Sequence, residues 1–164
     1  MATRNDSLAT LEATEVALRR LAGSLDDAAL DFHPVPDAWS IREILAHLVD
    51  DEMFILRNRL ARIVKEERPH LAPHDEKLWY ANRNTAYDKL DELLTDFHVQ
   101  RTASLGVVRL LRPADWQRVG FQPEIGEFTA EGWLELWAKH DTTHLNQIEQ
   151  VLQTYQQQQH PPTS

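Results

Sequence analysis

Apolar residues recur at helical spacing in four long stretches of this chain, and segments that contain proline or glycine separate the stretches. Amphipathic helices of such length bury their apolar faces against one another, and the chain shows no convincing strand pattern that could provide another partner. We therefore expect an all-α fold, a four-helix bundle with long connections, in a single domain that spans residues 1–164. The long helices are expected at residues 5–25, 41–66, 85–111 and 130–155, with a short helix at 75–84.

Local signals mark the ends of these helices. Ser40, with Glu43 three positions later, matches a capping box at the start of the second long helix, and Thr129 is expected to cap the fourth. Residues 116–128 contain glycine and proline, which favours an irregular loop with at most a short β-like excursion. The glutamine-rich tail, residues 156–164, is expected to be flexible.

The composition of the chain excludes several classes of protein. Hydrophobic residues make up 42% of the 164 positions, which is enough for one domain with a sizeable core. There is no cysteine, so any metal ion must be held by histidine, aspartate or glutamate. The formal net charge is -9 with no basic run, which argues against nucleic acid as a partner. No secretory signal and no membrane-length apolar run is visible, so we expect a cytoplasmic protein without a membrane partner.

A pair of histidines stands out in the last predicted helix. His140 and His144 are four residues apart, which places their imidazoles one above the other on one helical face. Trp133, Trp137 and Ile148 fall on the same side, so the ring nitrogens lie on an apolar face and need partners. Two explanations stay open. One is two core histidines bonded to polar neighbours; the other, which the paired spacing favours, is a bound zinc, nickel, copper or iron ion.

Three further polar residues are candidates for a role in chemistry. Periodicity places His47 off the buried stripe of the second helix, which predicts a solvated surface histidine. Asp51, one turn later, could orient a ligand or accept a proton, although a solvated carboxylate is the commoner outcome. Asp141 stands where zinc-protease helices carry a glutamate, but its apolar neighbours favour a buried hydrogen-bonding role. Asp51 and Asp141 are thus weak candidates for catalytic residues, and the general base is not identified.

Two charges interrupt otherwise apolar stripes. Arg101 falls on the core face of the third long helix, and Glu52 lies within the stripe of the second. A buried charge without a partner is very costly, so we expect Arg101 to be buried and paired. Glu52 is the first choice of partner and Asp141 the second.

Three local patterns coincide in an order and at separations that resemble the DinB-like family, which is related to the YfiT-type proteins assigned as metal-dependent hydrolases. The resemblance extends from about residue 8 to residue 155. The patterns are Asp-Ala-Trp-Ser-Ile-Arg-Glu-Ile-Leu-Ala-His-Leu-Val-Asp-Asp-Glu at 37–52, Phe97 with Arg101 and Asp115-Trp116, and Gly126-Glu-Phe-Thr129 leading to His-Asp-Thr-Thr-His-Leu-Asn-Gln-Ile at 140–148.

The resemblance implies a four-helix bundle with a rearranged order of helix directions. It also implies a metal site with one histidine from the second helix and two from the fourth, which are His47, His140 and His144 here. This contradicts the surface position that periodicity predicts for His47. The implied cofactor is a divalent ion, zinc or nickel first, with iron or manganese as further candidates. Three neutral imidazoles leave an open coordination position.

The implied activity is that of a hydrolase or a thiol transferase, in which the metal activates water or a thiol toward a small-molecule substrate. The alternative, which stays open, is a non-catalytic metal- or ligand-binding bundle that acts through oligomerisation. A homodimer is expected, partly from the resemblance and partly because the second and fourth helices carry wide apolar arcs that include Leu56 and Leu60.

Overall fold

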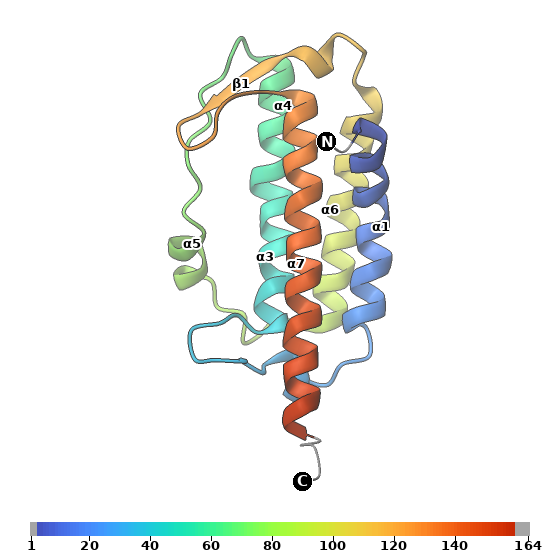
Figure 1. Cartoon of the computed structure of the whole chain (residues 1–164), viewed down its shortest axis with the longest axis vertical. Helices are drawn as coiled ribbons and strands as arrows, with labels where there is room; N and C mark the ends of the chain where they lie inside the picture. The colour runs from blue at the N-terminus through green and yellow to red at the C-terminus, as the bar shows by residue number, and fades with distance from the viewer. Residues whose placement is uncertain (1–2, 160–164) are drawn as a thin grey trace.

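Four long helical segments stand side by side in the structure, a computed structural model that describes residues 3–159 (Figure 1). The expected all-α bundle is confirmed. The long segments are α1 (Arg4–Ala22), α3 (Ile41–Asp51) continued through the π-helical turn η1 (Glu52–Leu56) into α4 (Arg57–Lys65), α6 (Leu90–Leu110) and α7 (Ala130–Gln159). The shorter elements are α2 (Asp27–Leu30), α5 (Glu76–Asn82), η2 (Asp115–Gln117), β1 (Val119–Gln122) and β2 (Gly126–Thr129).

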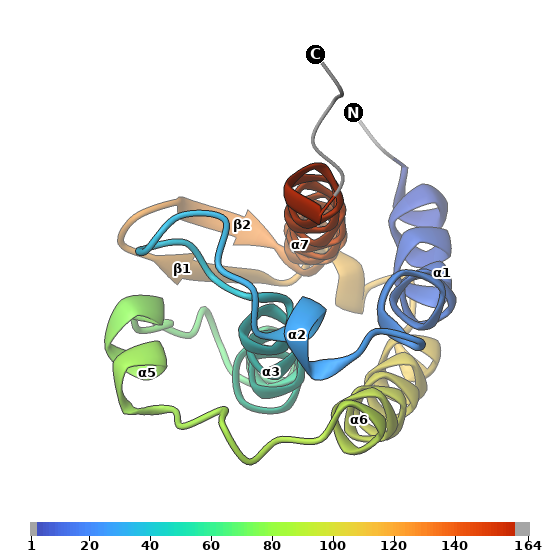
Figure 2. The ribbon, with the colours of Figure 1, turned by 90° about the horizontal axis from the view of Figure 1, so that it is seen from below.

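The four segments form a ring in which each has two neighbours. Viewed from below, α1 lies between α7 and α6, and α3 lies between α6 and α7 (Figure 2). The chain descends in α1, ascends in α3–α4 and again in α6, and descends in α7 (Figure 1). Since α4 and α6 run in the same direction, the connection between them, residues 66–89, must return along the whole bundle. It does so at the outside and carries α5.

The expected caps are confirmed. The backbone N–H of Ser40 donates to Glu43 Oε2 at 2.7 Å, and the N–H of Glu43 donates to Ser40 Oγ at 3.3 Å, which is the reciprocal capping box. At the start of α7, the N–H of Gly132 donates to Thr129 Oγ1 at 3.0 Å. These bonds fix where α3 and α7 begin, and both helices carry histidines of the candidate site.

The expected uninterrupted helix at 41–66 contains a π-helical turn, which the sequence analysis did not foresee. A π turn holds an extra residue and disturbs the regular ladder of backbone bonds. Here the carbonyl of Leu56 accepts a bond of 3.0 Å from Trp133 Nε1. In an α-helix, positions four apart drift around the axis by about 40° per step. The wider π turn counteracts this drift and keeps residues four apart on the same side of the helix. Asp51, Ile55 and Arg59, which are four apart, accordingly line one cavity.

The segment at 116–128 was expected to be mainly an irregular loop, but much of it is regular. Strands β1 and β2 pair as an antiparallel hairpin that lies over α4. Gly126 has φ +82, a conformation that glycine adopts without strain. Gly120 passes so close to α4 that a Cβ there would lie 2.9 Å from Ile63 Cγ1. The hairpin can therefore sit tightly on the helix and form one wall of the cavity.

Two helix ends differ from the expectation. Helix α1 ends at Ala22 rather than at residue 25, and the side chain of Asp26 then caps the short helix α2. At the other end of the chain, α7 continues beyond the expected end at residue 155 to Gln159, so residues 156–159 of the expected tail are helical. The remainder of that tail, residues 160–164, lies outside the described residues.

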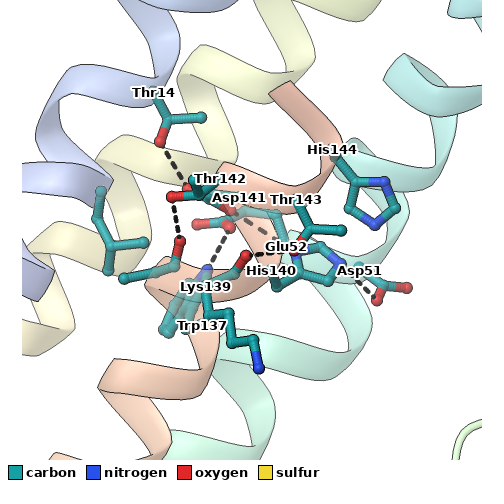
Figure 3. A network of polar contacts seen from close by, with 12 residues as sticks. Thr14, Asp51, Glu52, Trp137, Lys139, His140, Asp141, Thr142, Thr143 and His144 are labelled. Atoms are coloured by element: carbon teal, nitrogen blue, oxygen red, sulfur yellow. Dashed lines mark hydrogen bonds and ion pairs between the residues drawn. The ribbon is translucent and has the colours of Figure 1, made fainter. Parts of the chain in front are cut away.

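A layer of buried charge separates two apolar clusters inside the bundle. Arg101 donates from Nε and Nη2 to both oxygens of Glu52 at 2.9 Å, and from Nη1 to Asp141 Oδ2 at 2.7 Å. Thr14 Oγ1 adds a bond of 2.7 Å to Asp141 Oδ2, and Trp137 Nε1 adds one of 3.1 Å to Glu52 (Figure 3). The side chains of the three charged residues are at most 2% exposed. The predicted pairing of Arg101 is confirmed, with both carboxylates at once.

The residues invoked for a dimer face the interior instead. Leu56 is 4% exposed and Leu60 is 0% exposed, and both belong to the core of the monomer. The sequence argument that these residues need a second copy is therefore wrong, and the homodimer itself stays a prediction. Within residues 3–159, every helix is too short or too polar for a membrane crossing.

Candidate metal centre

Three imidazoles meet in the groove between α3 and α7. Nε2 of His47 lies 3.1 Å from Nε2 of His144 and 3.2 Å from Nε2 of His140. His47 is 5% and His144 9% exposed, so the surface position that periodicity predicts for His47 is wrong. The reason is that α3 is packed on several sides, and its outer side is covered by Trp39, whose ring centre lies 5.0 Å from that of His47.

The second nitrogen of each ring faces an oxygen acceptor. An acceptor at Nδ1 favours the tautomer that carries its proton there, which leaves the Nε2 lone pair free. The Nδ1 contacts are His144 with Gln147 Oε1 at 2.9 Å, His140 with Asp141 Oδ1 at 3.6 Å, and His47 with Asp51 Oδ1 at 3.7 Å. Only the contact of His144 is a hydrogen bond; in each of the other two rings, Nδ1 faces a carboxylate oxygen at a longer distance.

The spacing of the three rings fits a metal ion. A tetrahedral zinc ion with bonds of 2.0–2.1 Å would place its ligand atoms about 3.4 Å apart, close to the 3.1 and 3.2 Å between the Nε2 atoms. On the far side of the His140 ring, the buried atoms His140 Nδ1 and Asp141 Oδ1 lie 3.6 Å apart, and neither has a hydrogen-bond partner among the described residues. His47, His140 and His144 could therefore hold a divalent ion.

The three histidines differ in the direction in which their surroundings shift the pKa. Burial lowers the pKa of His47 to about 3, although Asp51 opposes the shift. Burial and the neighbouring His140 lower the pKa of His144 to about 4. Burial also disfavours the charged form of His140, but Asp141 and Asp51 outweigh it and raise the pKa of His140 to about 9. Without a metal at neutral pH, the cluster thus holds two neutral rings and one imidazolium.

Asp51 lies beside the cluster and is not the solvated carboxylate that was thought commoner. It is 3% exposed, with Oδ2 3.4 Å from His140 Nε2 and Oδ1 3.2 Å from His74 Nε2. Burial opposes ionisation of Asp51, but the bond to His140 and the charges of the surrounding histidines hold the pKa of its carboxyl below the ordinary value. Asp51 is therefore an anion in contact with the histidine cluster.

Asp141 lies on the opposite, core side of the cluster (Figure 3). It is 0% exposed, and Oδ2 already accepts bonds from Thr14 and Arg101. The buried hydrogen-bonding role expected for Asp141 agrees with this position. Its free Oδ1 faces His140, so Asp141 links the charged layer of the bundle to one imidazole of the site.

The sequence analysis missed one residue of the site, His74, and it gave Trp39 a core role although that tryptophan could also line a pocket. His74 comes from the connection before α5, where no periodicity reveals which side chain turns inward. Trp39 precedes α3, and its ring stacks on Tyr80 of α5 at 5.0 Å and lies nearly parallel to His144 at 6.3 Å. Only the return path of residues 66–89 along the bundle brings His74 and Tyr80 to the cluster.

A cavity of about 220 Å³ borders the cluster. Its lining comes from α3–α4, α7, the hairpin and the start of α5, and it combines apolar side chains with charged and polar ones. It is lined by Asp51, Ile55, Leu56, Arg59, His74, Glu76, Gln122, Glu124, Ile125, Trp133, Leu136 and His140. A larger hollow of about 400 Å³ runs along α5 and shares only His74 with this cavity.

Comparisons with known proteins relate this chain to one family. Residues 10–148 match the sequence model of the DinB superfamily. Protein OB0782 of Oceanobacillus iheyensis is 29% identical over 147 residues, which are 88% of this chain and 83% of that protein. YfiT of Bacillus subtilis is 27% identical over 146 residues, 86% of this chain and 79% of its own. Both relatives are described provisionally as metal-dependent hydrolases.

A solved structure supports the same relationship at the level of the fold. YfiT from Bacillus subtilis, reported with an unusual four-helix bundle topology, superposes with a TM-score of 0.81 at 22% identity. The match covers 90% of this chain and 85% of that one. In this chain the four long helices follow the descending, ascending, ascending and descending order described above. With a family match that extends from residue 10 to residue 148, this chain belongs to the DinB superfamily.

Proposed function

We propose that this protein is a divalent-metal-dependent enzyme of the hydrolase type, in which His47, His140 and His144 hold the ion. The observation that carries the proposal is the convergence of three Nε2 atoms, 3.1 and 3.2 Å apart, at the edge of a cavity. A divalent cation held there supplies Lewis-acid activation of water or of a thiol. Zinc or nickel suits three imidazoles best, with iron or manganese after them. The provisional description of the relatives as metal-dependent hydrolases supports water as the nucleophile.

The other residues of the site orient and balance the histidines. Gln147 fixes the ring of His144 through Nδ1, and Asp141 faces Nδ1 of His140. Asp51 lines the cavity and contacts the cluster, with Oδ2 3.4 Å from His140 Nε2. Glu76 also lines the cavity, and its carboxylate lies within 4.8 Å of a ring nitrogen of His47 and of an oxygen of Asp51. We assign Asp51 the acceptance of the proton from the attacking group, because its ionised carboxylate both lines the cavity and lies 3.4 Å from His140 Nε2.

The cavity favours an enzyme over a non-catalytic binding bundle. A binder that acts through oligomerisation would cover the open side of the cluster with a second copy of the chain. In this structure the open side, which includes His140 and Asp51, faces a space within one chain that is large enough for a small molecule.

Metal restoration tests this function. Metal-free protein is loaded with zinc or nickel, its metal content is measured against a competing chelator, and ester, amide and thiol-conjugate substrates are screened. Activity should depend on the ion and should be lost in His144→Ala. His98→Ala is the matched control, because His98 is exposed and pairs with Glu15 far from the cluster. Equal activity of His144→Ala and wild type, or no metal retained by the wild type, would refute the proposal.

A further inference from the structure

An arginine lines the cavity without a carboxylate partner. Nη2 of Arg59 on α4 donates to the carbonyl of Ala72 at 2.6 Å, and its Cζ lies 5.4 Å from the ring centre of Trp133. Among residues 3–159, Arg59 forms no ion pair. Burial lowers the pKa of Arg59, with Asp51 and Glu124 opposing the shift, and a guanidinium stays charged at neutral pH.

Two arginines that are more deeply buried than Arg59 each pair with two carboxylates. Arg42 bonds the carboxylates of Asp27 and Asp31, and Arg101 bonds Glu52 and Asp141. A partly buried guanidinium that has only one carbonyl acceptor leaves most of its five donors free. At the wall of a cavity, such donors are available to a ligand.

The carboxylates of the cavity do not take these donors. Asp51 faces the imidazoles, Glu124 accepts a bond of 3.0 Å from the amide of Gln122, and Glu76 is exposed. Arg59 is therefore the cation with free donors at this cavity. Asp51 and Arg59 are eight residues apart on one helical segment, roughly 12 Å along its axis. The space between them is bordered by apolar side chains, including Ile55 and Trp133.

We infer that Arg59 binds a carboxylate of the substrate while the group that reacts lies at the histidine cluster. This inference rests on the proposed function and names its substrate class: a small molecule with a carboxylate at one end, a short apolar chain, and an ester, amide or thioester group at the other. A carboxylate group, with one negative charge, suits the surroundings of Arg59 better than a phosphate group with up to two, because Asp51 and Glu124 line the same cavity. The planar fork of the guanidinium also matches a carboxylate.

Binding measurements test Arg59 without any reaction. Glutarate is titrated calorimetrically into metal-free and zinc-loaded protein, with the neutral diamide glutaramide and inorganic phosphate as comparison ligands. Arg59→Gln should weaken glutarate binding by about ten- to hundredfold, the range for a charge-assisted bond, and should leave glutaramide unchanged. The control is Arg109→Gln, since Arg109 is an exposed arginine on α6. Equal glutarate affinity of Arg59→Gln and wild type, or tighter binding of phosphate than of glutarate, would overturn the inference.

An activity measurement separates the two proposals. Mono-4-nitrophenyl glutarate carries the carboxylate, and 4-nitrophenyl pentanoate is its neutral counterpart of the same length. Arg59→Gln should lower kcat/KM for the charged ester about ten- to hundredfold, mainly through KM, and should leave the neutral ester unaffected. Hydrolysis of both esters with no effect of Arg59→Gln would reject the role of Arg59 and keep the hydrolase. Hydrolysis of neither, with glutarate binding that still depends on Arg59, would reject the hydrolase and keep the anion site.

Discussion

In each imidazole of the candidate centre, Nδ1 faces a side-chain oxygen on the side away from the other two rings. Gln147 bonds Nδ1 of His144 at 2.9 Å, while Asp141 and Asp51 stand 3.6 and 3.7 Å from Nδ1 of His140 and of His47. Among these three partners, Asp141 is the one that is also bonded to a buried arginine. The site is thus prepared by the same side chains that stabilise the interior.

The raised pKa of His140 governs how metal binding depends on pH. At neutral pH, His140 of the metal-free protein carries a proton that must leave before Nε2 can bind an ion, because its pKa is about 9. We expect about one proton released per ion near pH 7, and an affinity that rises about tenfold per pH unit up to about pH 9. The other two histidines should contribute only below about pH 4. Zinc calorimetry in buffers of different ionisation enthalpy measures the proton count, and a count of zero would contradict this expectation.

Arg101 is the residue whose loss should cost the most stability. Arg101→Met leaves the carboxylates of Glu52 and Asp141 buried without their cation, which should lower the free energy of unfolding by about 3–5 kcal/mol. Urea unfolding followed by circular dichroism measures the loss. Arg109→Met, at an exposed ion pair, should change stability by less than about 0.5 kcal/mol. If Arg101→Met does not fold, the milder Glu52→Gln takes its place. A loss no greater than that of Arg109→Met would show that the buried charges are not coupled.

The sequence pattern predicted the buried pairing of Arg101 more completely than the histidine cluster. Arg101 and Glu52 could be paired from sequence because each interrupts an apolar stripe, and a buried charge needs a partner. His140 and His144 could be recognised from their spacing. The burial of His47 could not, because periodicity assumes one buried face, whereas nearly all of α3 is enclosed. Only the family resemblance placed His47 with the other two.

Among the elements, α3 depends on its cap for the position of His47. Ser40→Ala removes one half of the capping box and should lower the free energy of unfolding by about 1 kcal/mol. Chemical denaturation measures the change, with Ser24→Ala as the control because Ser24 is exposed in a connection. Zinc affinity should stay within about threefold, since the remaining turns hold His47 in place. An unchanged stability would mean that tertiary packing alone sets the start of α3.

The elements that the sequence did not reveal are those created by tertiary contacts. The π turn at Glu52–Leu56 needs another helix, because Trp133 takes the carbonyl of Leu56 and Arg101 takes the side chain of Glu52. The hairpin rests on the fit of Gly120 against Ile63, which is a contact between distant segments. Caps such as that at Ser40 were predictable because every atom involved lies within four residues.

For the whole molecule, the expected homodimer now rests on the family resemblance alone, since Leu56 and Leu60 are inside the core. Multi-angle light scattering over a range of protein concentrations should give twice the chain mass of 19.0 kDa. A variant that places a charge on the exposed face of α6, Val99→Glu, reports whether that face takes part, because Val99 is 53% exposed. A mass of one chain at every concentration would disprove the dimer.

The contact between the first and last helices has a kinetic consequence. Helix α1 packs more extensively against α7 than against any other element, and the two lie at opposite ends of the chain. Contacts between remote segments close large loops and form late, so this bundle should fold more slowly than helical proteins whose neighbours follow one another in sequence. During synthesis, α1 cannot complete its packing until α7 has been made. The histidine cluster also forms late, because His47 meets His140 and His144 only when the last helix docks.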